Sequence, residues 1–421
     1  MITPKTLLGF LMFQRDSILS VASSNSARWL GLIFVLSAGI AREYDGEYLT
    51  GEPWHLVLPL AASVIGCITI ALLVGILSWA RTVRDVSLFT QFGSILNVYW
   101  MTAPMACLYA IPFERFMDPG GATRANLTLL GIVSVWRVTL MIRCVSVLYA
   151  ASLIAATMPV MVFCLGMGYA ALTLIPSPVF MIMGGIRLTE SEDIILGVKM
   201  MLIACAVVTA PIWIIGYLTC CSAKSPWRWQ LREFEGQNQP ASKAAWMTAI
   251  VALGFLLPFL PWTQHEQWLR WRAEKLLLTG AIDELSQLTR EHPEKDLPPH
   301  WDPPPRTGYG EIKPDLIPTI LNIHASGPAT WFWQLYLNKL ERYRFPFYFA
   351  SNRLDDSNLA VFIEIFDELN ISPWQAESID QSIEQSLQDE SISQERQDLL
   401  KAMQKRCKAT SAKSIRIEGT N

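Results

Sequence analysis

The chain has 421 residues, of which 51% are hydrophobic and only 17% are charged, and its mean hydropathy is positive. This composition is too apolar for a soluble globular protein. The net charge of −3, with 16 Lys and Arg against 13 Asp and Glu up to Trp262 and 18 against 24 after it, excludes the strongly basic surface typical of nucleic-acid binding.

The first residues do not have the pattern of a secretory signal peptide. Lys5 precedes a short apolar run, which ends at Gln14, Arg15 and Asp16 without a small-residue cleavage site. We expect residues 1–26 to form an N-terminal segment with an interfacial amphipathic helix.

Charge-free windows of about 20 residues predict a polytopic, all-α membrane bundle over residues 27–262. We expect about seven spans, with six as the alternative. The predicted spans are Trp29–Ala41, Leu56–Ala80, Val86–Phe113, Asn126–Ile142, Leu153–Ile175, Met200–Cys221 and Ala244–Gln264. The first is short for a span. The region Ala125–Ile186 has room for two or three, and our preferred division places a turn at Arg143–Ala151.

The distribution of Lys and Arg predicts a cytoplasmic N-terminus in a plasma or bacterial inner membrane. The opposite side receives the acidic first loop, AREYDGEYLTGEP, after the first span. Seven spans would place the C-terminal segment outside the cytoplasm, whereas Arg270, Arg272 and Lys275 favour the cytoplasm for it. The span count and these cations therefore predict opposite sides of the membrane for the C-terminal segment, and one span more or fewer would move it to the other side.

The C-terminal segment is predicted to be mainly helical and outside the membrane. Apolar residues at helical spacing predict juxtamembrane amphipathic helices over 263–297. A proline-rich linker follows over 298–313, which is typical of an extended spacer. We expect a small helical domain over 314–407 and a disordered tail over 408–421.

Three cations at membrane depth form the candidate polar site: Arg137, Arg143 and Lys199. Ionisable residues inside a bilayer are costly and commonly functional. On this interpretation they line a polar cavity for an anion or a lipid headgroup. The simpler interpretation is that they snorkel towards the interface, Lys199 from about one turn into its helix and the arginines from beside a turn.

No enzymatic or metal-binding pattern is present. The five histidines lack metal-ligand spacing, and none of the predicted spans contains Asp, Glu or an interior His. Cation binding by the acidic first loop is an alternative to its simple solvation. We therefore predict no cofactor, no metal and no catalytic residue.

Two stretches, TAPMACLYAIPFERF (Thr102–Phe116) and SVWRVTLMIRCVSVLYAASLIAA (Ser134–Ala156), resemble the membrane domain of the Yip family, multi-pass proteins named for interaction with Rab-type GTPases. The likeness covers Trp29–Cys221, about half of the chain. It implies a helical membrane domain without enzymatic activity, which in eukaryotic members acts in vesicle trafficking. The additional spans and the long C-terminal segment depart from the family pattern, so neither GTPase binding nor any site residue is carried over.

These observations favour a non-enzymatic, Yip-like membrane scaffold or adaptor that presents its C-terminal segment to a protein partner. The alternative is a transporter or channel for a small solute, which would use proline-kinked spans together with Arg137, Arg143 and Lys199. We expect the lipid bilayer to be the principal surrounding of the bundle and expect no nucleic-acid partner.

Overall fold

The computed structural model describes residues 1–80, 88–174, 189–222, 229, 239–305, 316–342, 355–369, 373–388 and 392–418. The chain divides into two compact units. The first contains Met1–Ile175, Asp193–Trp268 and Pro298–His300, and the second contains Pro176–Glu192, Leu269–Leu297 and Trp301–Asn421. This division after Trp268 lies close to the change in composition at Trp262.

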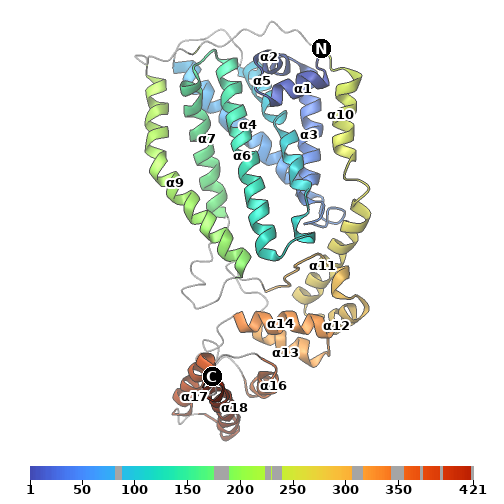
Figure 1. Cartoon of the computed structure of the whole chain (residues 1–421), viewed down its shortest axis with the longest axis vertical. Helices are drawn as coiled ribbons and strands as arrows, with labels where there is room; N and C mark the ends of the chain where they lie inside the picture. Colours follow the sequence, from blue (N-terminus) through green and yellow to red (C-terminus); the bar gives the residue numbers. More distant parts are fainter. Residues whose placement is uncertain are drawn as a thin grey trace. The chain divides into compact units, whose positions relative to one another are not determined.

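The elements of the described residues are helical, apart from an isolated bridge between Ile2 and Ala241 (Figure 1). Five stretches are long and apolar enough to cross a membrane: Trp54–Leu77, Gln91–Arg115, Pro119–Leu148, Leu153–Ala171 and Glu190–Cys221. A sixth is added if Arg15–Ala22 and Asn25–Glu43, bent by 96°, are counted as one broken span. An all-α membrane protein is therefore supported, while the predicted count of about seven spans is not confirmed.

The helices of these stretches overlap the predicted spans. They are α4 (Trp54–Ala80), α5 (Leu88–Trp100) continued by η1 (Ala103–Ala110) and η2 (Phe113–Arg115), α6 (Pro119–Leu148), α7 (Leu153–Leu174) and α9 (Glu190–Cys221). Helix α6 extends beyond the predicted Asn126–Ile142 at both ends, and α9 begins at Glu190 instead of Met200. The predicted cytoplasmic N-terminus rests in part on Lys and Arg residues of the loops after α4 and α9, and these residues lie outside the described residues: Arg81, Arg84, Lys224, Arg228 and Arg232.

The predicted turn at Arg143–Ala151 is wrong in its start, because α6 continues to Leu148. An arginine does not end a helix by its charge, and its intrinsic helix propensity is high. The chain leaves the helix where Ala150 adopts φ 45°, in the left-handed region that a helix cannot contain. Arg143 is consequently a helix residue and not a turn residue.

The N-terminal segment differs from the single interfacial helix that we predicted. It forms two short helices, α1 (Pro4–Leu11) and α2 (Arg15–Ala22), followed by α3 (Asn25–Glu43). Apolar side chains of this segment are buried in the core of the first unit, among them Ile2 before α1, Leu7 and Phe10 of α1, and Ile18 and Val21 of α2. Leu8 of α1 and the following Met12 remain 63% and 54% exposed, so α1 has both a buried and an exposed apolar side.

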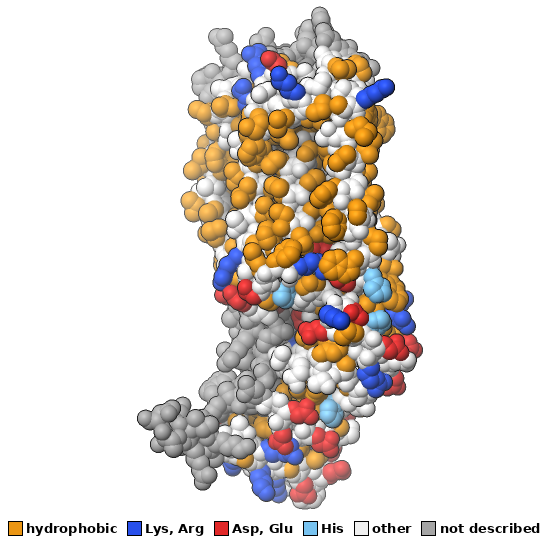
Figure 2. Space-filling view, turned by 45° about the vertical axis from the view of Figure 1, so that its right-hand side comes forward, with side chains coloured by type: hydrophobic (Ala, Val, Ile, Leu, Met, Phe, Trp, Pro, Cys, Tyr) orange, Lys and Arg blue, Asp and Glu red, His pale blue; other side chains and the backbone are white. Residues whose placement is uncertain are grey.

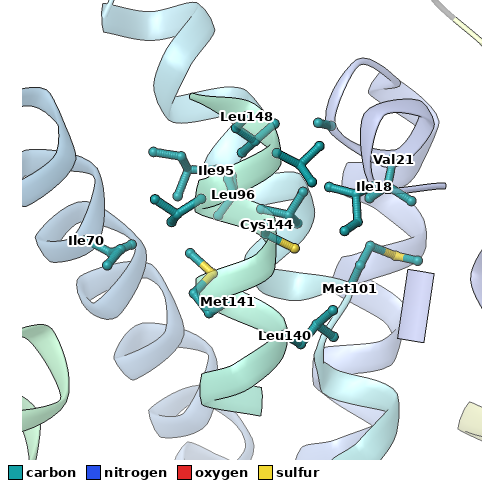
Figure 3. Close-up of a cluster of buried hydrophobic side chains, with 14 of the residues drawn as sticks. Ile18, Val21, Ile70, Ile95, Leu96, Met101, Leu140, Met141, Cys144 and Leu148 are labelled. Atoms are coloured by element: carbon teal, nitrogen blue, oxygen red, sulfur yellow. The ribbon is translucent and has the colours of Figure 1, made fainter. Parts of the chain in front are cut away.

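The core of the first unit includes side chains of α2, α4, α5 and α6, some of which are drawn in Figure 3, together with side chains of α1, α3, α7 and α10 (Lys243–Gly254). Ile18 and Val21 of α2 lie beside Leu140 and Cys144 of α6, and all four are fully buried. On the outside, hydrophobic side chains cover the visible face of this unit in Figure 2. An apolar outer surface around an apolar core is what a bilayer demands of a helical bundle.

The last predicted span, Ala244–Gln264, is not one continuous helix. Helix α10 (Lys243–Gly254) ends before the turn residues 255–259, and α11 (Leu260–Thr279) begins after them. Pro258 lacks an amide hydrogen and therefore interrupts the helical hydrogen-bond ladder. Pro261 lies at the start of α11, where proline is tolerated.

Three hydrogen bonds hold this segment alongside α3. Ser24 Oγ donates to the Gln239 carbonyl (2.5 Å) at the start of α3, and Ser37 Oγ donates to the Ala252 carbonyl (2.8 Å) in its middle. Beyond its end, Gln264 Nε2 donates to the Tyr44 carbonyl (3.0 Å). The segment from 239 to 264 therefore runs parallel to α3 over the length of that helix.

The second unit is also helical and contains its own buried apolar residues. Its helices are the later part of α11, α12 (Ile282–Glu291), α13 (Leu316–Ala325), α14 (Thr330–Arg342), α16 (Asp356–Phe366), α17 (Pro373–Leu387) and α18 (Gln394–Glu418). Fully buried side chains include Phe332, Tyr336, Phe362 and Met403. Helix α18 extends to Glu418, whereas the sequence predicted disorder from Lys408 onwards.

The proline-rich linker is not a free spacer over the part that the structure describes. The ammonium group of Lys339 on α14, 1% exposed, donates to the carbonyls of Pro303 and Pro305 (2.9 Å for the latter) and pairs with Asp302 at 2.8 Å. Tyr336 Oη donates to the Pro304 carbonyl at 2.6 Å. Residues 302–305 therefore pack on α14, while 306–313 lie outside the described residues.

Candidate functional site

Arg137 of the predicted polar site lies on α6 and is bonded inside the bundle. Its Nε donates to Thr102 Oγ1 at 3.2 Å, and Thr102 Oγ1 in turn donates to the Tyr99 carbonyl at 2.7 Å. Thr102 is only 3% exposed and lies where α5 gives way to η1. Arg137 thus ties α6 to the break between α5 and η1.

Arg143 serves a different place in the bundle. Its Nε donates to the Phe13 carbonyl at 3.4 Å, a long bond, in the turn between α1 and α2. Phe13 has φ 62°, and its ring lies 5.4 Å from the ring of Trp136. The arginine therefore helps to hold a turn whose backbone is in the left-handed region.

Lys199 is 8% exposed and lies nine residues after Glu190, where α9 begins, and so deeper in its helix than the one turn that the sequence predicted. The two arginines are six positions apart on one helix, so their side chains leave α6 in different directions. Each donates to a different element, as described above. The two arginines therefore have different hydrogen-bond partners, Thr102 for Arg137 and the Phe13 carbonyl for Arg143, and do not share a contact in the described residues.

Two buried amides at membrane depth were missed by the sequence analysis. Gln91 Nε2 donates to Tyr149 Oη at 2.6 Å, joining α5 to the end of α6. Asn97 Nδ2 donates to the carbonyls of Ala22 (3.2 Å) and Ser24 (3.0 Å). These carbonyls belong to the 96° break between α2 and α3, where intrahelical donors are missing.

Our search for charge-free windows could not find these residues, because amides carry no charge. Gln91 and Asn97 are six positions apart in the predicted span Val86–Phe113. A polar residue buried in a bilayer needs a partner, so their presence was a detectable signal. The partners themselves follow only from the packing of α2 and α6 against α5.

A second polar group lies at the other end of α3, around Arg115. The Arg115 guanidinium donates to both oxygens of Glu266, at 3.3 and 2.8 Å, and its carbon lies 4.2 Å from the centre of the Trp262 ring. Asn126 Nδ2 donates to Glu114 Oε1 at 2.5 Å. This arrangement joins η2 to α6 and α11.

Burial, together with the negative charges of Glu114 and Glu266, raises the pKa of the nearby Asp45 carboxyl to about 6. Arg115 opposes the shift. The positive charge of Arg115 thus offsets part of the repulsion among the carboxylates of Asp45, Glu114 and Glu266. The sequence placed Asp45 in an acidic loop but gave no reason to expect Arg115 beside it.

The first loop (residues 44–53) is held by two amide side chains of α11. Gln264 Nε2 donates to the Tyr44 and Glu47 carbonyls, both at 3.0 Å, and Gln264 Oε1 accepts from the Thr50 amide at 3.3 Å. Gln267 Nε2 donates to the Asp45 carbonyl. Gln264 and Gln267 are 7% and 1% exposed, so α11 fixes the loop backbone from a buried position.

Within the part of the chain that the structure describes, one group has the residue types and spacing of a metal site. It consists of Glu43 at the end of α3, Glu47 in the first loop and His55 in the first turn of α4, with one ligand atom of each lying within 4.8 Å of the others. His55 Nε2 lies 3.9 Å from Glu47 Oε2 and 3.5 Å from Glu52 Oε2. The sequence analysis expected no metal site.

The other histidines have partners of other kinds. The rings of His265 and Trp268 are stacked 5.9 Å apart, and His324 lies 5.2 Å from Trp333. His292 lies 3.5 Å from Asp296, and His300 Nε2 lies 3.0 Å from the Met117 carbonyl.

Comparisons of the chain with protein-family models, with curated proteins and with solved structures find no match.

Proposed function

We propose that this protein is a non-enzymatic integral membrane scaffold, in which a helical bundle anchors the C-terminal unit and presents it to a protein partner. The observation that carries the proposal is the bonding of the polar side chains at membrane depth, of which Gln91 and Asn97 are buried and Arg137 is half-buried. Gln91, Asn97 and Arg137 bond to the bundle's own backbone and hydroxyl groups. Polar side chains that hydrogen-bond within the bundle stabilise its helix packing, and the bonded groups are not available to line a substrate path.

The second unit suits the role of the presented part. It is a compact unit separate from the bundle and has its own buried aromatic and aliphatic side chains, such as Tyr336 and Phe362. Its long helix α18 packs on α17 and α16 through the buried Leu400, Met403 and Cys407. Ion pairs also join these helices, Arg396 to Asp356 at 2.8 Å and Arg406 to Asp367 at 2.5 Å.

For the topology, the proposal includes seven crossings with a cytoplasmic N-terminus. The seventh is made by α10, the turn 255–259 and the start of α11, because this segment runs parallel to α3 along its whole length. Two parallel segments that begin at the same end of the bundle leave it at the same opposite end. The C-terminal unit would then lie on the side opposite the N-terminus, despite Arg270 and Arg272.

The resemblance to the Yip family remains part of this proposal. It applies to the bundle region Trp29–Cys221 and is supported by the helical, multi-pass character of that region. It implies a role that depends on partners and not on catalysis.

The test uses the purified full-length chain in liposomes and a matched truncation in cells. A panel of small solutes is offered to the liposomes, and the wild type is compared with an R137Q/R143Q/K199Q variant. The scaffold proposal expects no flux with either protein and lower thermal stability for the variant. Flux that falls in the variant would identify a transporter with proline-kinked spans such as α4, α7 and α9.

Partner capture is tested by deleting residues 301–421 and, as a control, only 408–421. The longer deletion retains Gln264, Glu266 and Gln267, which hold the first loop. We expect it to remain inserted and to lose a partner that is cross-linked reproducibly to the full-length chain. Retention of that partner by the longer deletion would contradict the assigned role of the second unit.

A further inference from the structure

We propose that Glu43, Glu47 and His55 form a binding site for a divalent transition-metal ion of the zinc class. This inference concerns the first loop and does not rest on the scaffold function proposed above. It begins from a mixed set of one imidazole and two carboxylates, with one ligand atom of each within 4.8 Å of the others. Glu52, whose Oε2 lies 3.5 Å from His55 Nε2, stands beside the set as a fourth oxygen donor.

Local backbone structure brings these residues together. The Glu47 amide donates to the Glu43 carbonyl at 3.0 Å, which forms a helical turn at the end of α3 and places residues four apart on one side. The His55 amide donates to the Glu52 carbonyl at 3.2 Å in a similar turn at the start of α4. The two turns face each other across the first loop.

The observed separations are close to those of a bound site. Tetrahedral zinc with bonds of about 2.0–2.2 Å places its ligand atoms about 3.4 Å from one another. His55 Nε2 lies 3.5 Å from Glu52 Oε2 and 3.9 Å from Glu47 Oε2. The ligand atoms of Glu43, Glu47 and His55 lie within 4.8 Å of one another, so side-chain rotation must shorten these separations by up to about 1.4 Å for the set to surround one ion.

The charges at this place favour a cation. Glu43, Glu47 and Glu52 bring three carboxylates to one imidazole, and the structure pairs Glu43 Oε1 with Arg42 Nε at 3.2 Å. The Arg42 side chain is 67% exposed, so this is a surface pair of the kind that contributes little. A divalent ion would relieve the repulsion among the carboxylates far more effectively.

The loop is organised without the ion. Gln264 holds the Tyr44 and Glu47 carbonyls and the Thr50 amide, and Gln267 holds the Asp45 carbonyl. The backbone that carries Glu47 is therefore fixed by buried amides of α11. A site fixed in advance loses less conformational entropy on binding.

The ligand types indicate which ion is favoured. Calcium and magnesium prefer sets made entirely of oxygen donors, whereas an imidazole nitrogen suits zinc and the neighbouring transition metals. One nitrogen with two or three carboxylate oxygens therefore matches Zn²⁺ better than Ca²⁺. We choose Zn²⁺ as the probe and Ca²⁺ as the comparison.

The experiment uses the untagged full-length protein in detergent, freed of metal by chelation. Cys205, the exposed thiol among the eight cysteines, is replaced by serine in every variant so that it does not bind the probe. Calorimetry with Zn²⁺ is expected to show one site per chain. H55Q and E47Q are expected to weaken its affinity at least about tenfold, and H265Q, a histidine stacked on Trp268, is expected to leave it unchanged.

Equal zinc affinity in the wild type, H55Q and E47Q would overturn the proposal. So would a site that binds Ca²⁺ more tightly than Zn²⁺. Melting temperatures recorded without metal show whether the variants remain folded.

A second measurement needs no variant. Diethyl pyrocarbonate modifies accessible histidines, and the modified peptides are quantified by mass spectrometry with and without Zn²⁺. Selective protection of His55, with His265 and His292 unchanged, supports the site. Modification of His55 that zinc does not reduce would overturn it, whatever the stability of the substituted proteins.

Discussion

The guanidinium of Arg115 donates to both carboxylate oxygens of Glu266, at 3.3 and 2.8 Å, and so joins η2 to α11. The side chains are 14% and 5% exposed. Removing one partner leaves the other charge buried without compensation, which commonly costs about 3–5 kcal/mol. We expect Glu266→Gln to lower the free energy of unfolding by about 3 kcal/mol, measured by denaturant titration of the detergent-solubilised protein.

Two further variants separate the ion pair from general damage. Arg115→Met should destabilise more than Glu266→Gln, because it leaves Asp45, Glu114 and Glu266 without their shared cation. The double variant Arg115→Met with Glu266→Leu should be less destabilised than Arg115→Met alone, since it also removes one unpaired carboxylate. Strictly additive losses would show that the two residues do not act as a pair.

Asn97 is expected to hold the break between α2 and α3. Replacing it by Leu leaves the Ala22 and Ser24 carbonyls without their donor, and a buried unsatisfied group costs about 1–3 kcal/mol. We expect a clearly lower melting temperature and faster hydrogen exchange in residues 15–30. The control is Gln91→Leu with Tyr149→Phe, which removes both partners of a buried bond and should cost less. Equal losses in the two proteins would contradict the assigned role of Asn97.

Gly31 allows α3 to approach the end of α5. A Cβ added there would lie 2.8 Å from the Cβ of Trp100, a backbone-proximal atom that cannot move away without shifting the helix. Gly31→Ala should therefore destabilise the bundle, despite the gain in helix propensity of about 1 kcal/mol. Gly131→Ala on α6 is the matched control, because nothing lies within 4 Å of its added Cβ. Thermal unfolding of the two variants should move in opposite directions, and a loss in Gly131→Ala as large as in Gly31→Ala would refute the packing argument.

Lys339 is expected to hold the proline-rich stretch on α14. Lys339→Met keeps the length of the side chain but removes the ammonium group that the Pro303 and Pro305 carbonyls and Asp302 share. Hydrogen–deuterium exchange should rise in the peptides covering 330–342, while the bundle peptides remain unchanged. Tyr336→Phe removes only the bond to the Pro304 carbonyl and should produce a smaller change. Uniform exchange throughout the second unit would instead indicate general unfolding.

The sequence predicted the positions of α4 and α7 well, because a long run without charge marks each of them. It located α6 and α9 but not their full length, because both contain charged residues: Arg124, Arg137 and Arg143 in α6, and Glu190, Glu192 and Asp193 at the start of α9.

The sequence failed at the two ends of the bundle for physical reasons. The sequence placed a helix boundary at Arg143, although this residue lies inside the continuous helix α6. Its side chain donates a hydrogen bond to the Phe13 carbonyl, in the turn between α1 and α2. Pro258 lies inside a charge-free apolar run, so the absence of charge predicted one continuous span. The proline instead interrupts the helix between α10 and α11.

For the candidate sites, the sequence identified Arg137 and Arg143 as polar groups at membrane depth and noted the acidic first loop. It did not indicate that Thr102 and the Phe13 carbonyl would accept their hydrogen bonds. Glu43, Glu47, Glu52 and His55 are close in sequence, yet helical turns on both sides of the loop were needed to bring their ligand atoms together.

The sequence alone determined that this chain is an α-helical membrane protein with a more polar C-terminal part, because a bilayer imposes length and apolarity on each span independently of its neighbours. Only the tertiary structure decided which polar groups meet. Ser37 bonds to a residue 215 positions away and Gln264 to one 220 positions away. Such pairs depend on which helices pack together and in what register, since a hydrogen bond requires its partners within about 3 Å.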